Sequence, residues 1–144
     1  MRRREVSLQC RLPKFPIDRA SLLEFALDVM GRLDFEGAVG VRIMGDRAIA
    51  DLNRKFLGRK GVTDVISFPS GDKDESGLVY LGDIAIGGRV ASRAADGAGL
   101  PLEGELRRLL LHGLLHLVGY DHETDRGRMS RKENALRREF GLEP

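Results

Sequence analysis

One stretch near the C-terminal end of the sequence, residues 112–122, constrains the fold more than any other part of the chain. It reads His-Gly-Leu-Leu-His-Leu-Val-Gly-Tyr-Asp-His and holds all three histidines of the protein. A helix through its first half would be apolar nearly all round, and such a helix belongs in the interior of a domain. Pro101 is well placed to open this helix, and Gly119 is well placed to end it in the left-handed conformation.

The three histidines have the spacing of a metal site. His112 and His116 are four residues apart and therefore share one face of a helix, and a turn at Gly119 would bring His122 back toward them. Histidine pairs at this spacing also arise by coincidence, but two imidazoles in an apolar helix are costly without partners, and a metal satisfies both. Three imidazoles with one position left for water are the ligand set of a catalytic zinc. The stretch therefore predicts one Zn²⁺ per chain, bound by His112, His116 and His122; zinc is preferred to nickel on typical ligand preference alone.

Gly113 argues against one class of zinc enzyme. Zincin proteases carry the pattern His-Glu-x-x-His, in which the glutamate is the general base, and this chain has Gly113 at that position. A metalloprotease is therefore a weak alternative. Asp121 and Glu123 flank the third histidine and are the nearest candidates for a general base, although Asp121 could instead only brace the turn.

The composition describes a single soluble globular domain over residues 1–144. Hydrophobic residues make up 42% of the chain and charged residues 32%, and no apolar run approaches the length of a membrane span. The basic start of the sequence, residues 2–4, is not followed by the apolar segment of a secretory signal, and a lone cysteine, Cys10, cannot form an internal disulfide. We therefore expect a cytoplasmic protein without a membrane partner. The oligomeric state is left open.

Periodicity along the chain predicts an α+β domain. Strands are expected near residues 5–12, 39–43, 62–68 and 79–86, and helices over about 18–33, 46–58, 88–98, the histidine stretch and 124–141. The order predicts a small mixed sheet of about four strands packed with about five helices, with the zinc-binding helix central and buried. Thr124 can cap the last helix. There, Glu133 and Glu139 offset much of the basic charge, so we expect a solvated surface helix.

The densest basic cluster outside the termini is formed by Arg54, Lys55, Arg59 and Lys60. Cations are favoured at the carbonyl end of a helix, so the cluster could be no more than a solvated helix end. It could equally be a rim that binds RNA phosphates. The net charge of +2 is too small to decide between these alternatives. Arginine outnumbers lysine, and its planar group suits phosphate.

Two aspartates, Asp64 and Asp83, fall within predicted strands where apolar residues are usual. A charged group there needs partners. A structural role, as a cap for backbone amides or a partner for an arginine, is the favoured interpretation. Orientation of a histidine ligand is the alternative.

The histidine pattern resembles the signature of the YbeY family of bacterial rRNA maturation factors, described as metal-dependent, single-strand-specific endoribonucleases. Two further segments match that family in the expected order, Thr-Asp-Val-Ile-Ser-Phe-Pro at residues 63–69 and Leu-Gly-Asp-Ile at residues 81–84. The resemblance implies the same α+β architecture, with zinc at the floor of an open cleft. It also implies a single-stranded RNA substrate, a role in small-subunit rRNA 3′ processing and ribosome quality control, and partners among small ribosomal subunit components.

The predicted reaction is phosphodiester hydrolysis, in which zinc would acidify its water and polarise a phosphoryl oxygen. His112, Arg59 and Asp121 are the candidate catalytic residues. The family pattern has an arginine four residues after Asn53, where this chain has Leu57, so Arg59 is expected to replace it across the turn at Gly58. A further departure puts Val62 where proline is usual. The alternative is a non-enzymatic ribosome assembly factor, whose zinc would be structural and closed by four protein ligands.

Overall fold

The computed structural model describes residues 3–119 and 126–142. The elements in chain order are β1 (Arg4–Cys10), α1 (Arg19–Arg32), β2 (Gly37–Met44), α2 (Asp46–Leu57), β3 (Val65–Pro69), β4 (Tyr80–Gly87), α3 (Gly88–Ala98), α4 (Leu102–Leu117) and α5 (Arg128–Glu139). The predicted α+β class is confirmed, with a mixed sheet and helices in the expected order.

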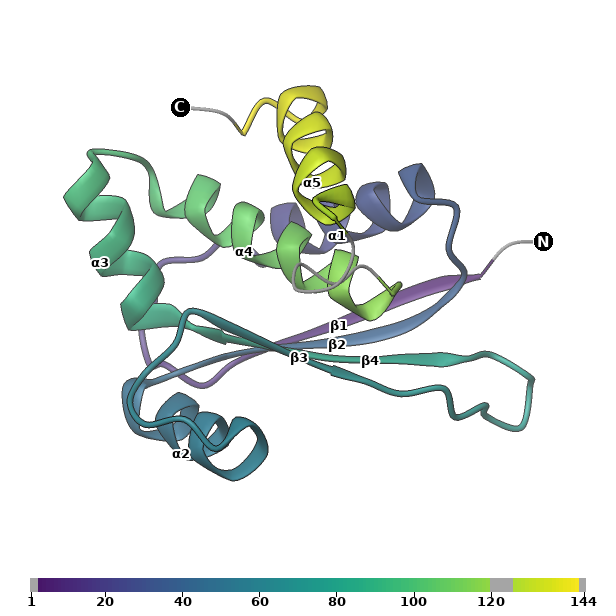
Figure 1. Ribbon diagram of the computed structural model, residues 1–144, viewed down its shortest axis with the longest axis horizontal. Coiled ribbons are helices and arrows are strands. Elements are labelled where there is room, and N and C mark those ends of the chain that lie inside the picture. The colour runs from purple at the N-terminus through teal and green to yellow at the C-terminus, as the bar shows by residue number, and fades with distance from the viewer. Residues whose placement is uncertain (1–2, 120–125, 143–144) are drawn as a thin grey trace.

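The strands form a sheet in the order β1-β2-β4-β3. β1 pairs with β2 and β2 with β4 in parallel, whereas β3 runs antiparallel to β4 at one edge. Helices α1, α4 and α5 lie on one side of the sheet and α2 on the other, with α3 beside one end (Figure 1). The fold is thus two layers deep over most of the sheet, and α5 adds a third layer on α4.

Strand β1 follows the predicted alternation. Leu8 is buried and Val6 and Cys10 pack against the core, while Glu5, Ser7 and Gln9 are exposed. The strand ends at Cys10 rather than near residue 12. Alternation of this kind gives a sheet one apolar and one polar face.

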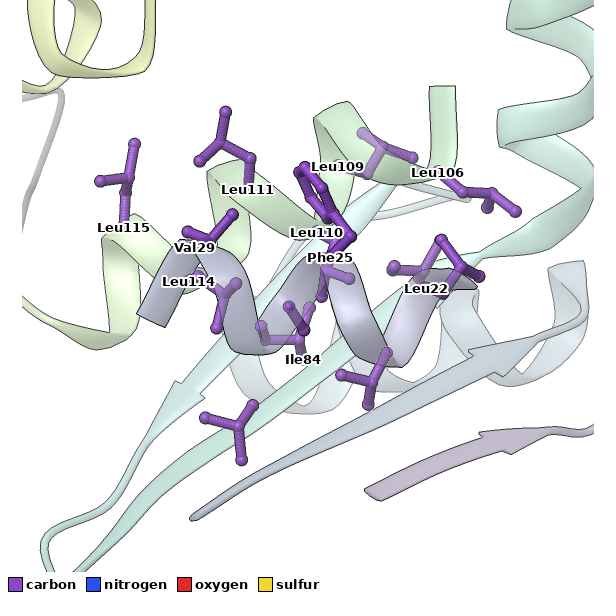
Figure 2. Packing of buried hydrophobic residues seen from close by; sticks show 14 of the residues in the cluster. Leu22, Phe25, Val29, Ile84, Leu106, Leu109, Leu110, Leu111, Leu114 and Leu115 are labelled. Carbon is purple, nitrogen blue, oxygen red and sulfur yellow. The ribbon is translucent and has the colours of Figure 1, made fainter. Parts of the chain in front are cut away.

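The main core lies between the sheet and helices α1 and α4. Side chains of α4, α1 and β4 meet there (Figure 2), and they include Leu22, Phe25, Val29, Ile84, Leu110, Leu111, Leu114 and Leu115. Half of the sixteen residues of α4 are buried. The prediction of a central, buried histidine helix is therefore confirmed.

Helix caps explain where the helices begin and end. Asp18 accepts a hydrogen bond from the Ser21 backbone N–H at the start of α1, and Pro101 precedes α4, both as predicted. The N-cap of α5 is Gly127, so α5 starts later than the sequence suggested; Thr124 lies outside the described residues. The aromatic rings of Phe25 and Phe140 hold α5 against α1, with centroids 5.3 Å apart.

A second, smaller core lies on the opposite face of the sheet, under α2. It consists of Met44, Ile49, Ile66 and Ala85, with Leu52 and Phe68 packed against them. Because α2 covers only one end of this face, the rest of the strands there carry exposed side chains such as Gln9 and Arg42. Within residues 3–119 and 126–142, no helix has the length and apolarity that a membrane span requires.

Candidate metal centre

Helix α4 places His112 and His116 one turn apart on the same face. Their ring centroids are 4.9 Å apart at an interplanar angle of 66°, and both side chains are partly exposed. The helix ends at Val118, and Gly119 follows with a φ of +103°. Two of the three predicted ligands are thus neighbours in the fold, whereas His122 and Asp121 lie outside the described residues.

The imidazole of His112 is held by a buried glutamate on α5. His112 Nδ1 lies 2.6 Å from Glu133 Oε1, and Arg137 Nη2 donates to Glu133 Oε2 over 2.6 Å. Glu133 is only 6% exposed. Since both carboxylate oxygens have a cationic or N–H partner, the buried charge is compensated.

This pairing corrects one expectation from the sequence. Glu133 was expected on a solvated helix surface, but it lies on the apolar stripe of α5, four residues after Met129 and three before Leu136. Met129 and Leu136 are two helical turns apart, and Glu133 occupies the position between them on the same face. A charged residue on a buried stripe is the signal that could have identified it.

The two described histidines have donor atoms that suit a metal ion. A metal-binding histidine usually donates its other ring N–H to a carboxylate, which fixes the tautomer and the ring orientation. With Nδ1 directed at Glu133, His112 would bind a metal through Nε2. Among the described residues alone, no three His, Cys, Asp or Glu side chains form a ligand set. His112 and His116 are the part of the predicted set that the structure describes.

Gly113 faces the sheet and not the histidines. A Cβ atom at this position would lie 2.7 Å from Ile84 Cγ2, which is closer than atoms can pack, so glycine lets α4 approach β4. The Gly113 carbonyl also accepts a hydrogen bond from Ser67 Oγ over 3.1 Å. A larger side chain at this position would press on Ile84, and the chain has glycine where a zincin protease carries its general base.

The two aspartates that were predicted to lie in strands have structural partners, but only Asp83 lies in a strand, and Asp64 comes just before β3. Asp64 accepts a hydrogen bond from the Val65 backbone N–H over 2.8 Å, and Asp83 accepts one from the Tyr80 hydroxyl. Asp83 lies on the sheet face away from α4, beside Gly40. The structural interpretation holds for both, and among the described residues the carboxylate found in contact with a histidine is that of Glu133.

The basic cluster spans the end of α2, with Arg54 and Lys55 in its last turn and Arg59 and Lys60 just beyond it. Gly58 ends this helix in the left-handed conformation, with φ of +65°, and the Arg59 N–H donates to the Asn53 carbonyl. All four side chains of the cluster are exposed, and Arg54 pairs with Asp51 at 3.3 Å. In the described part of the chain, no hydrogen bond or ion pair of the Arg59 side chain is found. Its role as a replacement for the family arginine stays a prediction.

Fold and site together define a class: a small α+β protein whose buried helix presents paired histidines, one of them fixed by a carboxylate. The family model described as Endoribonuclease YbeY matches residues 14–141, and the chain belongs to this family.

Several relatives carry the name Endoribonuclease YbeY. The chain is 45% identical over 118 residues to that of Anaeromyxobacter sp. (strain Fw109-5), an alignment that covers 81% of this chain and 60% of the relative. It is 37% identical over 139 residues to that of Geobacter sulfurreducens, covering 94% and 93%. The chain thus spans less than two thirds of the first relative's length and nearly all of the second's.

The fold resembles the solution structure of TM1509 from Thermotoga maritima. The TM-score is 0.61 at 25% sequence identity, and the match covers 96% of this chain and 93% of TM1509. The arrangement of a four-stranded mixed sheet with helices is therefore shared with a solved structure.

Proposed function

We propose that this protein is a zinc-dependent endoribonuclease that cuts single-stranded RNA. The observation that carries the proposal is the pair of histidines on α4, with His112 fixed by Glu133. Family membership supports it, because the matching family model and the relatives are named endoribonucleases. A helix that served packing alone would not need a buried carboxylate paired with an imidazole, because burying such polar groups is costly.

In the proposed mechanism, the residues of the chain hold and orient the reacting groups. Arg137 pairs with the buried Glu133 carboxylate, and Glu133 keeps the His112 ring in one orientation. His112, His116 and His122 would hold the metal. When bound, zinc supplies a Lewis acid for the phosphodiester and an acidified water as the nucleophile.

Phosphate binding is assigned to the basic cluster. Arg59 would neutralise the charge that develops on the phosphate, while Arg54, Lys55 and Lys60 would bind neighbouring phosphates of the RNA. Asp121 is the candidate general base. We further propose that the substrate is an rRNA precursor in the cytoplasm, cut at the 3′ end of the small-subunit rRNA, with small ribosomal subunit components as partners and a role in ribosome quality control.

The test uses purified protein with a labelled single-stranded RNA and the matching perfect duplex. We expect slow cleavage of the single strand, no cleavage of the duplex, loss of activity with a chelator and recovery when zinc is added back. His112→Ala should be inactive. Cleavage that survives both metal removal and His112→Ala would identify a contaminating nuclease and reject the proposal.

A structural zinc would give the same metal content, so coordination must be measured separately. The absorption spectrum of cobalt-substituted protein reports the ligand field. A position open to water should respond to added small anions, whereas a site closed by four protein ligands should not. An unresponsive spectrum together with inactivity on RNA would favour the assembly-factor alternative.

A further inference from the structure

A groove lies on the face of the sheet opposite to the histidine helix. It has a volume of about 330 Å³, which is in the range of small-ligand pockets. It is lined by Arg42, Met44, Leu52, Phe56, Phe68, Asp83, Ile84 and Ala85. These residues come from α2, β2, β3 and β4, so the groove lies where α2 stops covering the sheet.

The wall of the groove is aromatic. Phe56 on α2 and Phe68 on β3 pack edge to face, with ring centroids 5.1 Å apart and an interplanar angle of 75°. Phe56 is nevertheless 61% exposed. An exposed ring that is steadied by a neighbour offers a flat surface on which a nucleobase can stack.

The floor of the groove carries a cation and a hydrogen-bond acceptor. Arg42 is exposed and, within the described residues, forms no side-chain hydrogen bond or ion pair. Asp83 accepts a hydrogen bond from the Tyr80 hydroxyl, and burial, followed by this bond, raises the pKa of Tyr80 to about 12. Tyr80 therefore stays a donor at neutral pH, and the second oxygen of Asp83 is suited to accept a hydrogen bond from a base.

The combination of charge and aromatic surface distinguishes between kinds of ligand. An apolar peptide segment in this groove would bury the Arg42 guanidinium without a partner, which is costly. A nucleotide would stack its base on Phe56 and place a phosphate on Arg42, so that the exposed ring is covered and the guanidinium has a partner. The basic cluster at the C-terminal end of α2 lies on both sides of Phe56 in the chain and adds positive charge near this end of the groove.

Strand β3 separates the groove from the histidine helix. Ser67 bonds to the Gly113 carbonyl of α4, whereas the next residue, Phe68, lines the groove. Successive side chains of a strand point to opposite faces, and β3 is one of the two edge strands. An extended strand of RNA that passes over this edge could therefore touch both surfaces.

We propose that this groove binds one nucleotide of a single-stranded RNA, at a position that flanks the segment held near the histidines. The proposal rests on the proposed function for the choice of RNA. It adds a binding site in which Phe56 stacks on the base and Arg42 binds a phosphate, on the sheet face opposite to the metal ligands.

The chain contains no tryptophan, so Phe56→Trp introduces a single fluorescent reporter at the site. We expect an unlabelled single-stranded RNA octamer to quench the fluorescence of this tryptophan, and a perfect RNA duplex of the same sequence to quench it far less. A tryptophan placed by Leu27→Trp on the exposed surface of α1 is the control. Equal quenching of the two reporters, or none at position 56, would overturn the proposal.

Equilibrium binding of a labelled octamer tests the two residues separately. Phe56→Ala should weaken binding by about 5- to 150-fold, the range for loss of one stacked base, while Leu27→Ala should not. Arg42→Gln should reduce the slope of log affinity against log salt concentration by about 1, the value for one phosphate contact. Arg89→Gln, at an exposed position on α3, should leave this slope unchanged. Unchanged affinity in both groove variants would overturn the proposal, as would a change in oligomeric state in place of a change in RNA affinity.

Binding is measured on the full chain with and without zinc, so it does not depend on cleavage. Quenching and octamer binding without any RNA cleavage would reject the endoribonuclease and keep the groove. Metal-dependent cleavage by a protein whose groove variants bind RNA normally would keep the endoribonuclease and reject the groove.

Discussion

Replacement of Glu133 by glutamine tests whether α5 helps to build the metal centre. Both partners of this carboxylate, His112 Nδ1 and Arg137 Nη2, lie 2.6 Å from it. A glutamine keeps the size of the side chain but has one acceptor oxygen instead of two. Its NH₂ group would then face one of two donors, and the negative charge is lost.

Two magnitudes follow from this geometry. Loss of a carboxylate partner from a metal-binding histidine typically lowers metal affinity about 10- to 100-fold, which corresponds to about 1.4–2.7 kcal/mol. Loss of a hydrogen bond to a charged group costs about 1.5–3 kcal/mol of folding stability. Because the Arg137 side chain is 31% exposed and can bond to water, we expect the metal-free protein to lose an amount near the lower end of that range.

Zinc affinity is measured by competition with a chromophoric chelator, and the stability of the metal-free protein by urea unfolding. Glu139→Gln is the matched control on the same helix, since Glu139 pairs with Arg32 at 2.7 Å but is 43% exposed. We expect the control to change stability by less than about 1 kcal/mol and zinc affinity not at all. If Glu133→Gln binds zinc within twofold of the wild type, Glu133 does not position His112 for a metal.

Three further predictions concern other parts of the site. Metal analysis should find close to one zinc per chain, and His116→Ala should remove it and lower the unfolding temperature; full zinc occupancy in that variant would contradict the ligand set. Gly113→Ala should gain about 1 kcal/mol of helix propensity but lose about 1–3 kcal/mol by overpacking against the sheet. Urea unfolding should therefore show a net loss of stability of up to about 2 kcal/mol. Gly104→Ala, whose nearest contact is a flexible arginine side chain at 3.7 Å, is the control and should be neutral or stabilising. Arg59→Ala should reduce RNA cleavage much more than Arg54→Ala with zinc content unchanged, and equal small losses would show that Arg59 does not replace the family arginine.

The sequence determined the features that depend on neighbouring residues. Helix α4 was predictable from its apolar run, from Pro101 before it and from Gly119 after it, because caps and periodicity act within one or two turns. The adjacency of His112 and His116 followed from their spacing on that helix. Alternation identified β1 and its buried face. Family membership was also visible in short motifs, because their residues are close together in the chain.

Only the tertiary structure decided which distant residues meet. Glu133 reaches His112 because α5 packs on α4. Helix packing depends on the whole core, so the place of Glu133 on an apolar stripe does not say which residue it contacts. The reason for glycine at position 113 is a contact with Ile84 on another element. The groove that joins Arg42 to Phe56 exists because α2 covers one end of the sheet and leaves the other open. Local patterns carry no information about such contacts, since each is set by the register and packing of elements far apart in the chain.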